Sequence, residues 1–346
     1  MKRLTPFVPL LLLGAFLLSP GAALAGAKRG LDIWWGSVFS ALLPCLIAVR
    51  SAQALGILGL AARHPRGKLA AVLSFSLLSG APNGAKLLHA LVEDGSLSPR
   101  EGQRLAPFVN CVSPAFLLSI IASELLKNKA LFGPMAAGFY GCILCCLVPA
   151  VFRRRDPSSP LHPSQAKALP FSDAISSAIE GSMLDMLRIG GCIVFSCTLL
   201  SLIQPLVAHE SLFAVCSGLM EVSTGASSIA ALTMPLRHKV SLLTSVAAFG
   251  GMSLALQTAC CYPALKLGPY LLGKLALGVL SGAACYLLFP LFPSVSAAFA
   301  SRQAMIDRSL SLSALLLSSL LSAAFMGVLA LMMNAKNRKA EIVVKE

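Results

Sequence analysis

The chain has 346 residues, of which 56% are hydrophobic and only 12% are charged. Soluble domains carry about 25% charged residues, so this composition excludes an ordinary soluble protein and indicates a multi-pass protein of the cell membrane, with the lipid bilayer as its main partner. The formal net charge of +14 suits the basic cytoplasmic loops of such proteins. No nucleic-acid-binding motif accompanies the charge, so we expect no nucleic-acid partner.

The first 25 residues have two interpretations. Lys2 and Arg3 precede an apolar run from Phe7 to Leu18, and small residues follow up to Ala25. This order is typical of a cleavable secretory signal, and it also fits a first transmembrane helix. In both cases the following residues begin outside the cytoplasm.

The first half of the chain contains three predicted crossings. Trp34 and Trp35, in an amphipathic segment, suit the membrane–water interface. A span begins at Val38, and further crossings are predicted over Ala106–Leu126, with an interruption at 110–114, and over Phe132–Phe152. Basic residues follow this last crossing and place its end in the cytoplasm.

Between these crossings lies Ser79–Lys86, which contains two glycines, a proline, an asparagine and a lysine after an apolar run of only Leu69–Leu78. Gly and Pro open backbone hydrogen-bonding groups, which a bilayer does not satisfy, so such a segment must be buried in protein or line a cavity. The polar stretch 93–104 follows, so the chain has to return to the side it came from. The pattern predicts a re-entrant broken helix and a candidate binding site.

The second half shows a similar order. After a Pro- and Ser-rich linker, the sequence predicts an interfacial amphipathic helix over Phe171–Arg188, a span over Gly190–Val207 and a second broken segment over Glu221–Ser228. Two further spans follow, over 240–262 and 269–289. The predicted organisation is a signal-like segment or first helix (1–25), a first repeat (26–155), the linker (156–170), a second repeat (171–292), a final transmembrane helix (293–335) and a cytoplasmic tail (336–346).

The two halves share landmarks. Gly84 corresponds to Gly225, 141 residues later, and Ser113 corresponds to Ser253, 140 residues later. Because each half has three crossings, the second half must run upside down relative to the first. Such inverted repeats are typical of secondary transporters, whose sites lie near the bilayer midplane. We therefore predict an all-α polytopic membrane protein of about eight transmembrane helices with two re-entrant broken-helix loops in two inverted repeats.

The broken segments supply the candidate ligand contacts. A half-helix that starts near Gly84 directs its positive end at an anion or polar group, and Lys86 adds a charge there or extends to the interface. Asn83 and Asn110 bind a ligand or satisfy the opened backbone. Glu221 binds a cation, carries a proton, pairs with Lys86, or is a solvated loop residue. The predicted substrate-binding residues are Pro82, Asn83, Gly84, Lys86, Asn110, Ser113, Glu221, Ser223, Thr224, Gly225 and Gln257.

Several kinds of chemistry have no support in the sequence. The vicinal pairs Cys145–Cys146 and Cys260–Cys261 lack the spacing of common metal sites. No phosphate-binding glycine-rich loop and no nucleophile elbow is present. We expect no metal, no cofactor and no enzymatic activity.

Four motifs in order carry a family resemblance: Gly30–Trp35, Ser79–Lys86, Phe108–Pro114 and Gly218–Gly225. From about residue 26 to 335 the chain resembles the family of the sporulation integral membrane protein YlbJ. That family carries the Gate, or nucleoside recognition, domain of concentrative nucleoside transporters and of ferrous-iron transporters. The resemblance implies a sporulation-associated protein that moves or senses a small polar solute, such as a nucleoside-like compound. The alternative is a non-transporting scaffold for spore assembly; partners of either are other sporulation membrane proteins or further copies of the chain.

Overall fold

The computed structural model describes residues 7–56, 65–93, 95–152, 169–207 and 209–292. The predicted final transmembrane helix, the cytoplasmic tail and most of the linker lie outside these residues. All regular structure in the described ranges is helical, as the sequence predicted. The helices are α1 (Phe7–Leu18), α2 (Pro20–Asp32), η1 (Ile33–Phe39), α3 (Ser40–Ala54), α5 (Pro65–Ser79), α6 (Asn83–Glu93), α7 (Pro99–Val109), η2 (Phe116–Leu125), η3 (Lys129–Leu131), α8 (Phe132–Phe152), α9 (Phe171–Ile203), η4 (Gln204–Leu206), α10 (Glu210–Met220), α11 (Val222–Ala231), α12 (Leu236–Phe249), α13 (Gly251–Cys261), α14 (Leu267–Leu288) and η5 (Phe289–Leu291).

The described residues include five helical stretches that are long and apolar enough to cross a membrane. A hydrocarbon core about 30 Å thick requires about 20 apolar residues in a helix. Shorter apolar helices, such as Leu69–Ser79 and Glu210–Met220, do not reach this length. The five stretches are Pro20–Ala54, Lys129–Val148, Phe171–Leu206, Leu236–Cys261 and Leu267–Leu291.

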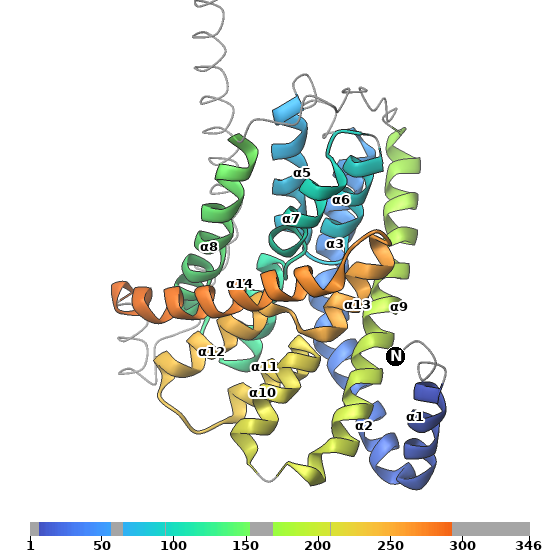
Figure 1. The fold of residues 1–346 in the computed structure, drawn as a ribbon, viewed down its shortest axis with the longest axis vertical. Coiled ribbons are helices and arrows are strands. Elements are labelled where there is room, and N and C mark those ends of the chain that lie inside the picture. The colour runs from blue at the N-terminus through green and yellow to red at the C-terminus, as the bar shows by residue number, and fades with distance from the viewer. Residues whose placement is uncertain (1–6, 57–64, 94, 153–168, 208, 293–346) are drawn as a thin grey trace, which may run out of the picture.

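Two pairs of shorter helices fold back on themselves. α5 and α6 pack against each other around a turn at Gly80–Pro82, and α10 and α11 pack against each other around a turn at Glu221. In Figure 1 the first pair occupies the upper half of the molecule and the second pair the lower half, and their turns meet near the middle. The two turns are called the first turn and the second turn below.

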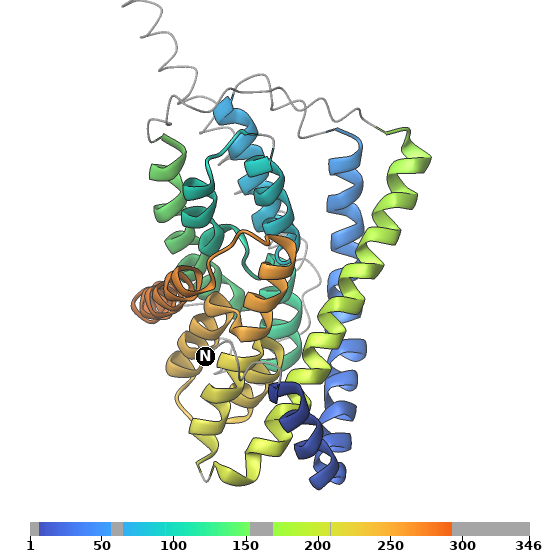
Figure 2. The ribbon, with the colours of Figure 1, turned by 45° about the vertical axis from the view of Figure 1, so that its right-hand side comes forward.

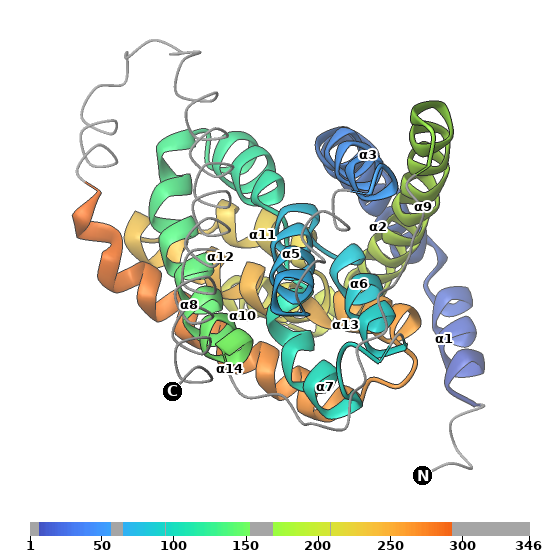
Figure 3. The same cartoon turned by 90° about the horizontal axis from the view of Figure 1, so that it is seen from above.

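Long helices flank this body. The continuous run α2–η1–α3 packs along α9, and Figure 2 shows α3 and α9 as two extended ribbons side by side. Seen from above in Figure 3, α3 and α9 form one flank, away from α8 and α14. α14 packs on α8 and α12 and runs across the view of Figure 1. The main core lies between these elements and includes Leu88, Leu117, Phe139 and Tyr270.

The predicted separation between an amphipathic helix at Phe171–Arg188 and a span from Gly190 is wrong, because α9 is one helix from Phe171 to Ile203. The Trp34 indole packs so closely on Gly190 that a Cβ there would lie 2.5 Å from its Cε2 atom. Its Nε1 donates to the Met186 carbonyl at 2.9 Å. Because Gly190 has no side chain, the Trp34 indole packs directly on the backbone of α9. The glycine does not end the helix.

The predicted span over 240–262 corresponds to the stretch Leu236–Cys261, but its helix is broken. It consists of α12 and α13, which meet at Gly250. Gly250 has φ of +83° and Gly251 has φ of +78°, a backbone conformation that residues with a Cβ rarely adopt. The chain is thus opened here as it is between α7 and η2.

Candidate functional site

A cavity of about 50 Å³ lies where the two turns meet. Ala81 of the first turn and Ser79 at the end of α5 line it, together with Glu221 of the second turn and Ser223 at the start of α11. Ser113, which follows α7, and Ser253 and Gln257 of α13 complete the polar lining. The apolar wall comes mainly from η1, α3, η2 and α9, with Val38, Leu42, Leu46, Phe116, Ile189 and Ile193.

The first turn is docked on the break that follows α7. Gly80 has φ of +71°, and a Cβ on it would lie 2.8 Å from the Ser113 nitrogen. Ala81 N–H donates to the Cys111 carbonyl at 2.8 Å. The groups opened by one broken element are therefore satisfied by the other, as backbone buried at membrane depth requires.

The second turn is held by Glu221, whose side chain is only 3% exposed. The Glu221 carboxylate accepts hydrogen bonds from Ser223 N–H at 2.9 Å, from Thr224 N–H at 2.7 Å and from the Thr224 hydroxyl at 2.8 Å. It thus caps the N-terminus of α11, where the helix dipole stabilises a negative charge. No ion pair joins Glu221 to another described residue, so the predicted pair with Lys86 and the solvated-loop interpretation are both wrong.

The break between α12 and α13 supports this second turn. A Cβ on Gly251 would lie 3.0 Å from the Met220 carbonyl oxygen, so glycine allows the two backbones to approach. In both halves, therefore, a turn between paired helices packs on a break in a neighbouring element.

Gln257 gives the cavity an unpaired acceptor. Its Nε2 donates to the Ser253 hydroxyl at 3.4 Å, while its buried Oε1 has no hydrogen-bond partner among the described residues. Together with the Glu221 carboxylate, this oxygen makes the cavity suited to a small cation or to a solute with hydrogen-bond donors. A volume of about 50 Å³ holds a few water molecules or one small ion, because one water needs about 10–15 Å³ by this kind of measure.

Four of the predicted residues line the cavity, namely Ser113, Glu221, Ser223 and Gln257. The two asparagines lie beside it and bond within the protein. Asn83 Nδ2 donates to the Ser79 hydroxyl at 3.1 Å. Asn110 accepts from Ala85 N–H at 3.2 Å and donates to the Thr258 hydroxyl at 2.5 Å. Asn110 therefore connects α6 to α13.

The remaining predicted positions are mainly packing points. A Cβ on Gly84 would lie 2.6 Å from the Val109 oxygen, and one on Gly225 would lie 2.1 Å from the Gly218 Cα. Thr224 bonds to Glu221 and also lies 3.0 Å from the Cys197 sulfur. Pro82 belongs to the first turn but does not line the cavity.

Lys86 pairs with a residue that sequence reasoning left out of the site. Its Nζ lies 2.5 Å from an oxygen of Asp185 on α9, which also binds Arg50 of α3. Asp185 is fully buried, with 0% of its surface exposed. The signal available in the sequence was the presence of isolated charges near the ends of apolar runs, but their partners depend on the packing of three helices.

Lys274 is a second ionisable residue that the sequence reasoning missed. It lies on α14 with only 1% of its surface exposed. Its Nζ donates to the Asn110 carbonyl at 3.3 Å and lies 3.6 Å from the Cys111 sulfur. The negative end of the α7 helix dipole stabilises a cation at this place. A lysine inside a predicted span was the signal that would have found it.

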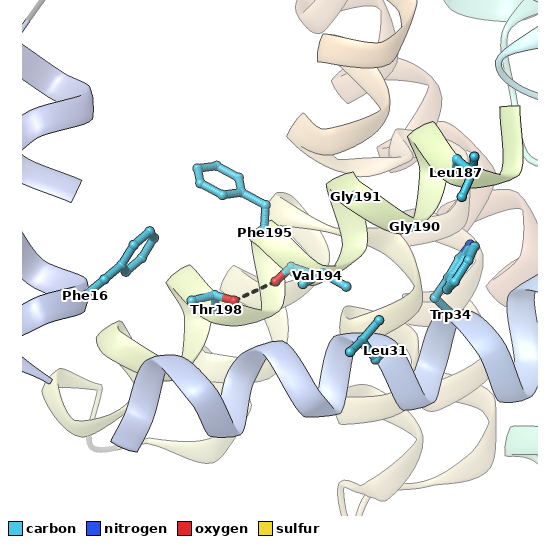
Figure 4. A pocket seen from close by; sticks show the side chains of 9 residues that line it. All are labelled: Phe16, Leu31, Trp34, Leu187, Gly190, Gly191, Val194, Phe195 and Thr198. Atoms are coloured by element: carbon cyan, nitrogen blue, oxygen red, sulfur yellow. Dashed lines mark hydrogen bonds between the residues drawn. The ribbon is translucent and has the colours of Figure 1, made fainter. Parts of the chain in front are cut away.

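A larger hollow of about 380 Å³ lies between α1, α2 and α9, as Figure 4 shows. Phe16, Leu31 and Phe195 contribute to its apolar lining. The Thr198 hydroxyl already donates to the Val194 carbonyl at 2.8 Å. This hollow therefore lacks the unpaired polar groups of the smaller cavity, and we place the candidate site between the two turns.

No family model and no solved structure matches the chain. The chain is 25% identical over 334 residues to the sporulation integral membrane protein YlbJ of Bacillus subtilis (strain 168), and the match covers 82% of each protein. The five apolar helical stretches agree with an integral membrane protein. The chain is therefore similar, along most of its own length and of the relative's, to a sporulation integral membrane protein.

Proposed function

We propose that the chain is a sporulation-associated membrane protein of transporter or channel type, which moves or senses a small polar solute at the cavity between its two turns. The name of the similar protein from Bacillus subtilis supports the link to sporulation. The observation that carries the rest is the convergence of both turns on one small cavity that contains a carboxylate and an unpaired amide oxygen.

The proposal includes an architecture of about eight transmembrane helices with two re-entrant helical hairpins in inverted repeats, as in Gate-type transporters. The order of the elements supports it. α3, the α5–α6 pair, the broken pair α7–η2 and α8 are followed by α9, the α10–α11 pair, the broken pair α12–α13 and α14. Turns that approach the middle of the molecule from opposite ends fit such a relation.

The cavity has the size of a closed site. Its volume of about 50 Å³ admits an ion or a few waters, so a solute as large as a nucleoside would require the two turns to separate. In this arrangement Glu221 and Gln257 bind the solute or its coupling ion, and the apolar side chains of α3 and α9 exclude water. Exclusion of water strengthens each polar contact inside the cavity.

The rival function is a membrane scaffold without transport. The internal hydrogen bonds favour it: Asn110 bonds to Ala85 and Thr258, and Thr224 bonds to Glu221, so these groups are satisfied without a ligand. The unpaired Oε1 of Gln257 is the observation that favours a ligand.

The test compares Gln257→Leu with Ser228→Ala as a matched control. Ser228 lies on α11 and does not line the cavity, and its hydroxyl, like Gln257 Oε1, has no partner among the described residues. Full-length protein is reconstituted into liposomes, and the uptake of labelled uridine and of ²²Na⁺ is measured. We expect wild type to take up one of these probes above protein-free liposomes, Gln257→Leu to lose this uptake at unchanged folding, and Ser228→Ala to retain it.

Two results would count against the proposal. Equal uptake by Gln257→Leu and wild type would remove the cavity from the transport path. No uptake of either probe by wild type, together with normal spore formation when Gln257→Leu replaces wild type in the native host, would favour the scaffold.

A further inference from the structure

Asp185 gathers three cationic side chains from three helices. It binds Arg50 of α3, lies 2.5 Å from the Lys86 Nζ of α6, and lies 3.6 Å from Arg188 of its own helix α9. One carboxylate thus faces three cations, an excess of two positive charges. The name basic cluster is used below for Arg50, Lys86, Asp185 and Arg188.

Two donors without acceptors lie at the basic cluster, one in Arg50 and one in the neighbouring Gln53. Arg50 Nε and Gln53 Nε2 are buried and have no hydrogen-bond partner among the described residues. They lie three positions apart on α3 and therefore on one face of it. Buried donors without a partner cost free energy, and here they leave the positive charge of the cluster further uncompensated.

The glycine at position 181 of α9 leaves space for the Arg50 guanidinium. A Cβ on Gly181 of α9 would lie 2.2 Å from Arg50 Nη1, so the guanidinium crosses α9 at a residue without a side chain. Only 18% of the Arg50 side chain is exposed, whereas 31% of the Lys86 side chain and 61% of the Arg188 side chain are exposed. The cluster is therefore fixed at its base and accessible at its outer edge.

Two uncharged runs indicate how deep in the bilayer the basic cluster lies. The residues from Ile33 to Val49 carry no charge and extend about 25 Å at 1.5 Å per residue, and Arg50 follows directly. On α9, Arg188 directly precedes the uncharged run Ile189–Ile203. A hydrocarbon core is about 30 Å thick, so both arginines lie at its polar boundary.

The sequence after α3 indicates on which side of the membrane the basic cluster lies. The segment after α3 carries Arg63, Arg66 and Lys68, which indicates the cytoplasmic side. The phosphates of anionic lipids lie at this boundary, and basic pockets between helices on the cytoplasmic side bind lipid headgroups.

We propose that the basic cluster binds a phosphate-type oxyanion and that an anionic phospholipid of the cytoplasmic leaflet supplies it. The phosphate accepts hydrogen bonds from the accessible ends of Lys86 and Arg188, and the surplus positive charge of the cluster attracts it. Guanidinium groups suit phosphate because their planar donors match two of its oxygens. This site is separate from the cavity between the turns, since none of the four residues of the basic cluster lines that cavity, and it does not depend on transport.

The test uses purified full-length protein in neutral detergent, with the unfolding midpoint Tm measured during titration with phosphatidylglycerol, phosphatidylcholine or inorganic phosphate. Arg188→Gln is the informative variant, because Asp185 keeps Arg50 and Lys86 as partners. Arg100→Gln, an exposed arginine at the start of α7, is the matched control. Arg188→Lys retains the charge.

We expect phosphatidylglycerol, but not phosphatidylcholine, to raise the Tm of wild type. Arg188→Gln should require about tenfold more phosphatidylglycerol for half of this effect, which corresponds to the loss of one charge-assisted contact. Arg100→Gln should behave as wild type, and Arg188→Lys should lie close to it. Equal responses of wild type and Arg188→Gln, or equal effects of the two lipids, would overturn the proposal. Stabilisation by inorganic phosphate that abolishes the lipid effect would overturn the lipid as the source of the oxyanion.

Discussion

The ion pairs of Asp185 make a prediction that follows directly from the geometry. In Asp185→Asn, Arg50 and Lys86 lose their negative partner while the shape of the side chain is kept. Removal of one member of a buried ion pair costs about 3–5 kcal/mol. Because Lys86 is 31% exposed and Arg50 is 18% exposed, water compensates part of this loss, and we expect the lower end, about 3 kcal/mol.

The loss is measured as a shift of Tm in detergent. Tm is taken from the decrease of the monodisperse fraction of the protein on heating. With an unfolding entropy of about 2.1 cal/mol/K per residue, 1 kcal/mol shifts the Tm of a chain of 346 residues by about 1.4 °C, so Asp185→Asn should lower Tm by about 4 °C. Glu180→Gln, at an exposed carboxylate of the same helix, is the matched control and should change Tm by less than about 2 °C.

A second mutation separates the ion pair from other effects at the same position. Lys86→Met should lower Tm in wild type but have little effect in the Asp185→Asn background, because the partner is already gone. A Tm for Asp185→Asn within 2 °C of wild type, or equal effects of Lys86→Met in both backgrounds, would refute the reasoning.

Three further predictions concern other contacts; two are measured by Tm and one by accumulation in the membrane. Lys274→Met should lower Tm by about 1–3 °C because it leaves a buried carbonyl unpaired at about 1–2 kcal/mol; the exposed Lys266→Met is its control, and equal shifts would contradict the capping of α7. Gly225→Ala should prevent normal accumulation in the membrane, since the added Cβ would lie 2.1 Å from a backbone atom of α10, whereas Gly191→Ala has no atom within 4 Å and should accumulate normally. Glu221→Gln should lower Tm by about 1–2 °C, because the cap of α11 loses its charge at about 1 kcal/mol; a higher Tm would show that the carboxylate is not a stabilising cap.

Local backbone chemistry explains which features of the fold were predictable. The breaks at Gly80–Pro82 and near Glu221 were visible because glycine, proline and isolated polar groups interrupt apolar runs. The glycine pairs were ambiguous. Gly250 and Gly251 open the chain, whereas Gly190 lies inside a continuous helix under Trp34. Only the neighbouring element distinguishes these cases, and it is distant in the sequence.

The candidate site shows the same limit. The sequence indicated Glu221 and Gln257 because polar groups are rare among apolar residues, and both line the cavity. It did not indicate that Asn110 would form hydrogen bonds with Ala85 and Thr258. Nor did it indicate that Lys86 would form an ion pair with Asp185, 99 residues away. Partner choice between helices is decided by their packing, which no local pattern contains.

The ionic contacts of Asp185 have a mechanical consequence. They link α6, and with it the first turn, to α3 and α9 by two ion pairs on one carboxylate. The bonds of Glu221, in contrast, remain within its own helix. Any widening of the chamber would therefore displace the α10–α11 hairpin more readily than its counterpart, and the two halves would contribute unequally to the motion.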